Sequence, residues 1–250
     1  MLELKNLSVG YTKESVLNDV SATFKKGKLI SVIGTNGCGK STLLRAALGL
    51  ISPSGGSVIL DGADISTLTR NEIARKISYL SQGKSVPDMT VEQLVLHGRF
   101  PYLSYPRRYS AADREIARAA MDTVGILPLA SFRLETLSGG MRQNAYIAMA
   151  LSQNTDYILL DEPTTYLDIA HQLDLMHLLK KLAQSGKCVI TVTHELPLAF
   201  EFSDELVLIN GGTVASHTTP ESLITEEILH TAFKVRLRRL DSTGKYYYEV

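Results

Sequence analysis

The chain has few of the features that mark secreted, metal-binding or membrane-spanning proteins. It holds two cysteines, Cys38 and Cys188, in 250 residues, and this pair matches neither a zinc ligand set nor a disulfide framework, which favours a reducing compartment. Its first residues, MLELKNLSVGY, alternate and carry charges, so we expect no secretory signal there. No apolar run approaches the roughly 18 residues of a membrane span. If the protein works at a membrane, another chain must cross it.

An excess of charge of one sign is also missing. Lys and Arg together number 26, as do Asp and Glu, and the pI is about 7.0. A general nucleic-acid binder usually carries an excess of basic residues, so we expect no nucleic-acid partner. The apolar share of 44% and the charged share of 21% are ordinary for a globular protein. The length is enough for one large domain or two small ones with a substantial core.

Short strands alternate with helices along the chain, a pattern that favours an α/β sheet. Predicted strands cover residues 2–11, 17–25, 29–33, 55–62, 76–82, 157–163 and 188–195, and a hairpin around Asn210-Gly211 covers 205–217. Predicted helices cover 41–50, 110–125, 170–184 and 220–233, and a polar tail follows the last one. Residues 90–153 show helices and no convincing strand, so a helical insertion from about 85 to 155 is expected.

The stretch GTNGCGKST, residues 34–42, has the spacing of a phosphate-binding P-loop between a strand and a helix. Glycines let backbone amides turn toward phosphate oxygens without a side chain in the way. Lys40 can reach the β- and γ-phosphates, and the Ser41 hydroxyl can bind Mg²⁺. A chance glycine turn is the alternative, which the flanking strand and helix disfavour. The predicted nucleotide contacts of this loop are Gly34, Asn36, Gly37, Cys38, Gly39, Lys40, Ser41 and Thr42.

An acidic pair ends the apolar run YILLDEP, residues 157–163. A carboxylate inside a buried parallel strand would be costly, so Asp161 and Glu162 belong at its carboxyl end, where α/β sheets bind ligands. Asp161 suits the Mg²⁺ shell, and Glu162 is placed to polarise an attacking water. A surface acidic pair would be the better interpretation if the P-loop did not precede it.

A second candidate phosphate-binding site lies further along the chain. LSGGMRQNAYIAMAL, residues 137–151, places a serine and two glycines before an apolar run with helical spacing. The Ser138 hydroxyl and the amides of Gly139 and Gly140 would lie at a helix N-terminus, which attracts an anion. Alone, this turn would be an ordinary helix cap. The chain thus carries two candidate phosphate sites.

Five stretches, in order, resemble the motifs of the ATP-binding cassette (ABC) ATPases: GTNGCGKST, LSGGM, ILLDEP, TTYLD and THE. The resemblance covers nearly the whole chain. It implies an α/β fold with a P-loop NTPase (RecA-like) core, an antiparallel β subdomain and an inserted α-helical subdomain. The core with the β subdomain would comprise residues 1–84 and 156–250, and the helical subdomain with LSGG residues 85–155.

The resemblance also answers why there are two phosphate sites. It implies that two copies of the chain meet head to tail, with each ATP held by the P-loop of one copy and the LSGG turn of the other. Gln82 resembles the glutamine that touches Mg²⁺ or water and reports to the membrane partner. Asp168 resembles an acid at the dimer interface, and His194 the histidine near the γ-phosphate. Tyr11 resembles the aromatic residue that stacks on adenine, although it could be a plain strand tyrosine.

The chain departs from the family pattern at four places. Met141 follows LSGG where a polar residue is common, basic residues are absent at Asn144 and Met149, and Thr35 replaces a frequent proline. These departures bear on the strength of closure and on coupling more than on ATPase activity. Within the loop, Lys40 and the helix N-terminus would favour the thiolate of Cys38, or this residue is a small side chain packed under the loop.

Two longer stretches resemble the ATPases of importers. LHGRFPYLS (96–104) and TTYLDIAHQLDLMHLL (164–179) are similar to those of iron–siderophore, haem and cobalamin uptake systems, of which some relatives carry oxyanions. This likeness implies a homodimer bound to a transmembrane permease dimer, fed by a substrate-binding protein. The ATPase would be cytoplasmic, peripheral on the inner face of the cell membrane.

Other classes share the ATP motifs. A soluble ABC ATPase of iron–sulfur cluster assembly stays open as an alternative, whereas DNA-repair members carry long coiled-coil or zinc insertions that do not fit this length and cysteine count. Glu162 argues against a non-enzymatic binding module. The cargo stays open, because this subunit would never touch it.

Overall fold

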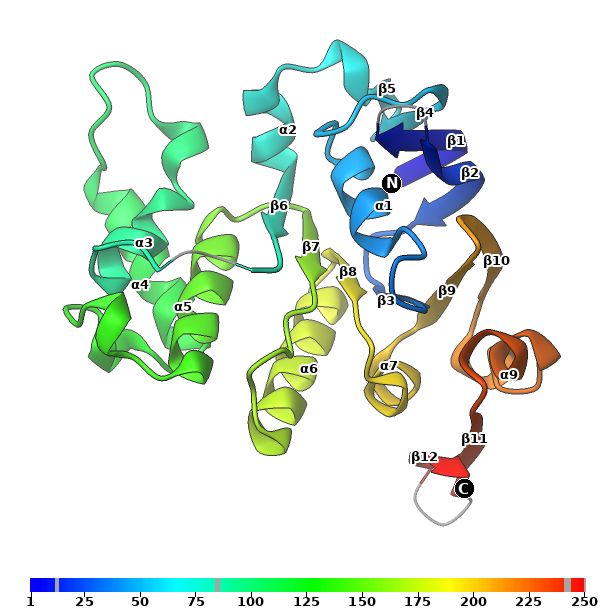
Figure 1. The fold of residues 1–250 in the computed structure, drawn as a ribbon. Coiled ribbons are helices and arrows are strands. Elements are labelled where there is room, and N and C mark those ends of the chain that lie inside the picture. The colour runs from blue at the N-terminus through cyan, green and yellow to red at the C-terminus, as the bar shows by residue number, and fades with distance from the viewer. Residues whose placement is uncertain (12–13, 84–85, 241–243, 250) are drawn as a thin grey trace. The chain divides into compact units, whose positions relative to one another are not determined.

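The computed structural model describes residues 1–11, 14–83, 86–240 and 244–249 (Figure 1). Two compact units comprise residues 1–69 with 176–250, and residues 70–175. The predicted domain boundary between residues 84 and 85 lies outside the described residues, and the domain limits stay a prediction. None of the helices in the described ranges is both long and apolar enough to cross a bilayer.

An antiparallel sheet opens the first unit, with strand order β2-β1-β4-β5. Its strands are β1 (Leu2–Tyr11), β2 (Glu14–Phe24), β4 (Gly55–Leu60) and β5 (Ala63–Asp64). The alternation of β1 buries Leu2 and Leu4 on one face and leaves the intervening Glu3 partly exposed, as a half-buried strand requires. The strands predicted at 2–11, 17–25 and 55–62 are confirmed within a few residues.

The first unit also contains a group of parallel strands, extended at one side by an antiparallel strand. β3 (Leu29–Gly34) lies parallel between β8 (Cys188–Val192) and β9 (Glu205–Asn210), and β10 (Thr213–Thr218) pairs antiparallel with β9. β3 and β8 are buried along their whole length. The predicted hairpin is confirmed, but its two loop residues are Gly211 and Gly212, with φ of 56° and 78°, because Asn210 pairs with Thr213.

The end of the chain differs from the prediction. The helix expected at 220–233 is two helices, α8 (Pro220–Leu223) and α9 (Glu227–Phe233). The expected polar tail contains a hairpin of β11 (Arg236–Arg239) and β12 (Tyr246–Glu249). Each strand buries a single residue, Leu237 and Tyr246, in the core beside Phe200, too few for an apolar alternation to be recognised. The unit also contains α1 (Lys40–Ala47), the 3₁₀ turn η1 (Ile65–Thr67) and α7 (Leu196–Phe202).

The second unit contains one parallel strand pair and a group of helices. Strands β6 (Ile77–Leu80) and β7 (Tyr157–Asp161) are parallel. The helices are α2 (Arg70–Lys76), α3 (Val91–His97), α4 (Ala111–Thr123) and α5 (Gly139–Ser152), with 3₁₀ turns η2 (Phe100–Tyr102), η3 (Leu127–Leu129) and η4 (Leu134–Thr136), and α6 (Ile169–Gln184) continues into the first unit. As predicted, residues 90–153 are helical and form no strand beyond the isolated bridge of Thr90 with Arg133.

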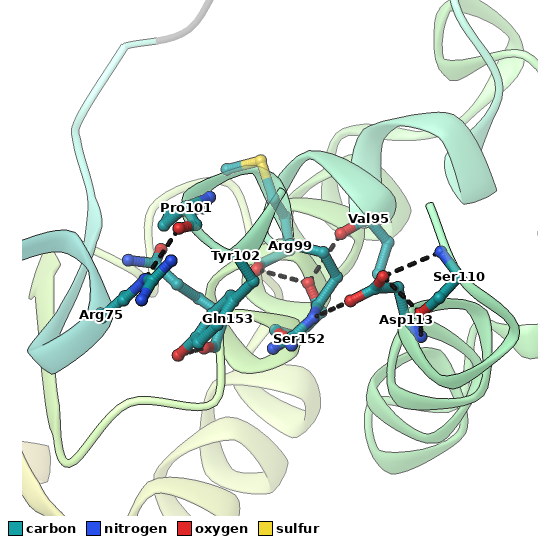
Figure 2. A network of polar contacts seen from close by, with 10 residues as sticks. Arg75, Val95, Arg99, Pro101, Tyr102, Ser110, Asp113, Ser152 and Gln153 are labelled. Atoms are coloured by element: carbon teal, nitrogen blue, oxygen red, sulfur yellow. Dashed lines mark hydrogen bonds and ion pairs between the residues drawn. The ribbon is translucent and has the colours of Figure 1, made fainter. Parts of the chain in front are cut away.

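A buried polar network holds α3, α4 and α5 together (Figure 2). Arg99, after α3, contacts the Asp113 carboxylate of α4 at 3.0 Å and donates to the Ser152 carbonyl of α5. Asp113 also accepts from Ser110, which caps α4 in the predicted capping box. The centroid of the Tyr102 ring lies 3.9 Å from the Arg99 guanidinium carbon. Because Arg99 and Asp113 are both buried, each depends on the other to offset desolvation.

We expect Asp113→Ala to lower the free energy of unfolding by about 3 kcal/mol, because it leaves the Arg99 guanidinium buried without its carboxylate and removes the carboxylate half of the capping box. Hydrogen bonds from Ser110 hold the pKa of Asp113 below its usual value. The stabilisation that comes with this lowered pKa is therefore fully present at pH values above the pKa of Asp113 in the unfolded chain. It is lost as pH falls through the pKa of Asp113 in the folded chain. Urea denaturation at neutral pH and under acid conditions measures both effects. The control is Glu115→Ala on the exposed side of α4, for which a comparable loss at neutral pH would contradict the prediction.

Candidate functional site

The glycine-rich loop joins β3 to α1, as predicted. Gly39 stands before α1 with φ of 106°, and a Cβ there would lie 2.6 Å from a methyl carbon of Leu17. A Cβ on Gly34 would lie 2.4 Å from the Ile209 carbonyl oxygen. The course of the loop therefore requires glycine at both positions. Along the loop, Asn36 and Gly37 are exposed, Ser41 is half-buried and Thr42 is buried.

Lys40 turns its ammonium group back onto the loop. Its side chain is buried, and Nζ donates to the carbonyl oxygens of Gly34 and Thr35, each at 2.9 Å. These carbonyls offset the desolvation of the charge. The result is a positive charge within the loop that leads to the N-terminus of α1, an electrostatic setting that favours a phosphate group.

The environment of Cys38 differs from the one expected for a thiolate. Its side chain is buried, with Sγ 3.9 Å from Lys40 Nζ. Burial raises the pKa of the Cys38 thiol, and the opposing effect of the Lys40 charge is smaller. The expected thiolate is therefore wrong, and the second interpretation, a small residue packed under the loop, describes the residue. Burial raises the pKa of Cys188, in β8, to about 12.

His194 follows the strand that pairs with β3. Val192, at the end of β8, lies opposite Val32 of β3, so His194 and Gly34 leave the sheet at the same edge. His194 is exposed there. Tyr11, at the end of β1, exposes 45% of its surface, and its hydroxyl accepts a hydrogen bond from Arg45 of α1 at 3.3 Å. The first unit thus carries the loop, His194 and Tyr11.

The second unit brings Gln82, Asp161 and Glu162 together. Leu80 of β6 lies opposite Leu160 of β7, so the residues that follow both strands meet at one edge. Gln82 Nε2 donates to Glu162 Oε2 at 2.5 Å. Asp161 is buried and accepts from the Tyr79 hydroxyl at 3.4 Å. The carboxylates lie at the carboxyl end of the buried strand, as predicted.

The signature turn, which we define as residues 137–140, begins α5. Ser138 is the N-cap: it is exposed, and its Oγ accepts from the backbone N–H of Met141 at 3.3 Å. Because this bond uses only the backbone of Met141, the cap does not depend on the side chain in which the sequence departs from the family. Gly139 and Gly140 form the first turn of the helix and are half-buried.

Asp168 is exposed at the start of α6. Its Oδ1 accepts from the backbone N–H of His171 at 2.9 Å and lies 2.8 Å from His171 Nδ1. These interactions, the backbone hydrogen bond first, hold the pKa of Asp168 below its usual value. The side chain therefore caps its own helix as well as facing solvent.

Gln143 and Thr165 lie beside the acidic pair but are not among the site residues predicted from the sequence. Gln143, on α5, donates through Nε2 to the Pro163 carbonyl at 2.8 Å, and the Thr165 hydroxyl lies 3.4 Å from Glu162 Oε2. Only the position of Gln143 within the first turns of the LSGG helix could have drawn attention to it. A glutamine on a helix is otherwise an ordinary surface residue.

A cavity of about 390 Å³ lies in the second unit beside the acidic pair. Its lining comes from the loop after β6, from α5 and from the segment after β7. The residues that line it include Gln82, Gln143, Asp161, Glu162, Thr165 and Tyr166. The Glu162 carboxylate is therefore half-buried at the edge of an open space that can admit water.

The chain is similar to known proteins over nearly all its length. A family model described as ABC transporter matches residues 17–165. The probable siderophore transport system ATP-binding protein YusV of Bacillus subtilis (strain 168) is 39% identical, over 94% of this chain and 86% of its own. The ferric enterobactin transport ATP-binding protein FepC of Escherichia coli (strain K12) is 39% identical, over 95% of this chain and 88% of its own.

Solved structures share the fold. An ABC transporter described as of the metal-chelate type, in an inward-facing conformation, superposes with a TM-score of 0.85 at 27% identity, over 100% of this chain and 97% of that one. The dimeric ATP-binding cassette MJ0796, bound to ADP and Pi after hydrolysis, superposes with a TM-score of 0.77 at 30% identity. The match covers 88% of this chain and 99% of that one. These likenesses confirm the predicted α/β P-loop fold. Because the family model and the relatives together cover nearly the whole sequence, the chain belongs to the ABC transporter family.

Proposed function

We propose that the chain binds and hydrolyses ATP as the nucleotide-binding subunit of an importer for a metal chelate, such as a siderophore, haem or cobalamin, or a related metal or oxyanion cargo. The carrying observation is the pairing of β6 with β7, which brings Gln82 to 2.5 Å from Glu162, directly after the buried Asp161. The names of the similar proteins, which include siderophore and ferric enterobactin transport, support the cargo class. They favour an importer over an iron–sulfur assembly ATPase.

In this proposal different side chains bind the phosphates, stack on the adenine and activate the attacking water. Lys40 exchanges its loop carbonyls for phosphate oxygens, aided by the amides of the loop and the N-terminus of α1. Tyr11, half exposed at the end of β1, stacks on the adenine. Glu162 accepts the proton of the attacking water as the general base, and Gln82 orients that water or carboxylate. His194 contacts the γ-phosphate.

A magnesium ion is the expected companion of ATP. Ser41 offers a hydroxyl, Asp161 a buried carboxylate and Gln82 an amide oxygen, and oxygen ligands of these kinds are those that Mg²⁺ prefers. When bound, the ion would neutralise charge on the phosphates. Asp161 supplies the negative charge, and Tyr79 holds its carboxylate in place.

The proposed working form is a head-to-tail dimer of the chain, bound to a permease dimer at the inner face of the membrane and fed by a substrate-binding protein. The exposed Ser138, with Gly139 and Gly140, offers its hydroxyl and amides to the γ-phosphate held by the other copy. Asp168, exposed after the acidic pair, lies in the dimer interface. The dimeric state of the similar cassette MJ0796 supports a dimer of this chain. Co-purification with a many-helix permease rather than with soluble scaffold proteins would distinguish the importer from the iron–sulfur alternative.

Glu162→Gln should lower ATP hydrolysis about 10²–10⁴-fold, the usual contribution of a positioned general base. Nucleotide binding should persist, because the amide keeps the shape of the side chain, and the ATP-bound dimer should accumulate. Phosphate release and equilibrium binding by the purified chain measure the two effects. Glu201→Gln, at an exposed position of α7, serves as the control. Turnover within a few-fold of the parent protein would remove Glu162 from this role.

Mixing two inactive variants tests whether each ATP is shared between copies. Lys40→Ala damages the loop and Ser138→Arg the signature turn, so a mixed dimer keeps one intact site and one doubly damaged site. ATP-dependent dimerisation and part of the hydrolysis should return on mixing, as measured by size-exclusion chromatography and phosphate release. If each copy used its own loop and turn on one nucleotide, mixing would restore nothing.

Maleimide labelling tests where ATP binds. Cys38 should react faster than Cys188, whose side chain is wholly buried and whose pKa is about 12. Because the pKa of Cys38 is raised, its labelling should accelerate as pH rises past the ordinary thiol pKa, and MgATP should slow it. Mass spectrometry of the labelled peptides gives both rates. Labelling of Cys38 that MgATP leaves unchanged would place the nucleotide elsewhere.

A further inference from the structure

The segment from residue 161 to 168 has a backbone that its own sequence does not favour. Glu162 and Tyr166 have φ of 52° and 70°, in the left-handed region that is unfavourable for side chains larger than glycine. The segment also borders the cavity of about 390 Å³, so packing does not hold that side of it. Hydrogen bonds from neighbouring side chains must therefore contribute to its conformation.

Gln143 makes one of these bonds from outside the segment. Its Nε2 donates to the Pro163 carbonyl at 2.8 Å. Pro163 is buried and has no N–H, so this carbonyl is its one backbone hydrogen-bonding group. The Pro163 carbonyl belongs to the following peptide, but the pyrrolidine ring restricts φ of Pro163 and the Glu162–Pro163 peptide before it is planar. Few free torsions therefore separate this carbonyl from the Cα of Glu162, so a displacement of the carbonyl is passed on to the Glu162 side chain.

We propose that Gln143 is a positioning residue for hydrolysis: by holding the Pro163 carbonyl, it sets where the Glu162 carboxylate lies. The inference rests on the proposed function, in which Glu162 is the general base. Gln143 touches no nucleotide in this role. Its effect passes through Pro163 to Glu162, while Gln82 and Thr165 contact the carboxylate itself.

The same bond joins the signature turn to the base within one chain. Gln143 lies on α5, one helical turn after Gly139. The turn also packs on the segment directly: a Cβ added at Gly139 would lie 3.6 Å from Tyr166 Cβ, and one at Gly140 3.4 Å from a Leu167 methyl carbon. Movement of the signature turn toward the ATP of the other copy thus pulls, through Gln143, on the base that serves this copy's own ATP.

The test compares Gln143 of α5 with Gln153, the residue that caps the end of the same helix. Gln143→Met keeps the length of the side chain and removes the donor, and should lower kcat about tenfold, since a displacement near 1 Å costs up to about 10²-fold, while KM for ATP stays within about twofold. Gln153→Met is the matched control: it removes similar bonds, from Gln153 Nε2 to the carbonyls of Ala74 and Ile77, and should leave kcat within about twofold. Gln143→Glu is a second variant of equal size, expected to lower kcat at least as much because its carboxylate repels the carbonyl.

A double variant separates positioning from general loss of structure. If Gln143 acts through Glu162, then Gln143→Met should cause no further loss in a Glu162→Gln background, measured as single-turnover release of radiolabelled phosphate. A tenfold further loss there, an equal fall in kcat for Gln153→Met, or a folded Gln143→Met with unchanged kcat would each overturn the proposal. Near-normal hydrolysis by Glu162→Gln alone would instead overturn the role of Glu162 in the proposed function.

Discussion

The carboxyl ends of parallel strands are the places where this chain can put charge beside its cores. β3, β7 and β8 are buried along their length, and an ionised group inside such a strand would be costly. The loop with Lys40 and His194 accordingly follow β3 and β8, while Asp161 is the last residue of β7 and Glu162 comes directly after it. In the second unit the register of β6 against β7 then fixes which side chains meet, because Leu80 lies opposite Leu160, and Gln82 and Glu162, each two positions further along, come into contact.

The same constraint explains why much of the site could be predicted from the sequence. An apolar run that ends in Gly, Asp-Glu or His predicts a buried strand and also predicts which group lies at its carboxyl end. The positions of the P-loop, of Asp161 and of Glu162 therefore follow from the local sequence pattern. The helix cap at Ser138 follows in the same way, because a serine before helical spacing satisfies the first free amides. The order of the motifs, as a family resemblance, implies the roles of Gln82, Asp168 and His194.

What the sequence could not give depends on contacts between residues far apart in it. The thiol of Cys38 lies beside Lys40 and a helix N-terminus, and these neighbours alone favour a thiolate, but burial under the loop outweighs them and raises the pKa. The hairpin of β11 and β12 has too few buried residues for an apolar period, and it forms because Leu237 and Tyr246 reach the core around Phe200. Gln143 has no signature of its own, since its partner, the Pro163 carbonyl, becomes visible only in three dimensions.

The backbone of Glu162 is strained, and side chains from two neighbouring elements hold it in this conformation. A left-handed backbone at a non-glycine residue costs about 1–3 kcal/mol and persists only where the surroundings hold it. Here the holding groups come from the loop after β6 and from α5, through Gln82 and Gln143. The family resemblance implies that Gln82 reports to the membrane partner, and the proposed contact to the second copy runs through α5, so both partners would act on the same strained residue. A carboxylate held by two separate elements would respond to a displacement of either, and hydrolysis could then depend on both partners without a further regulatory site.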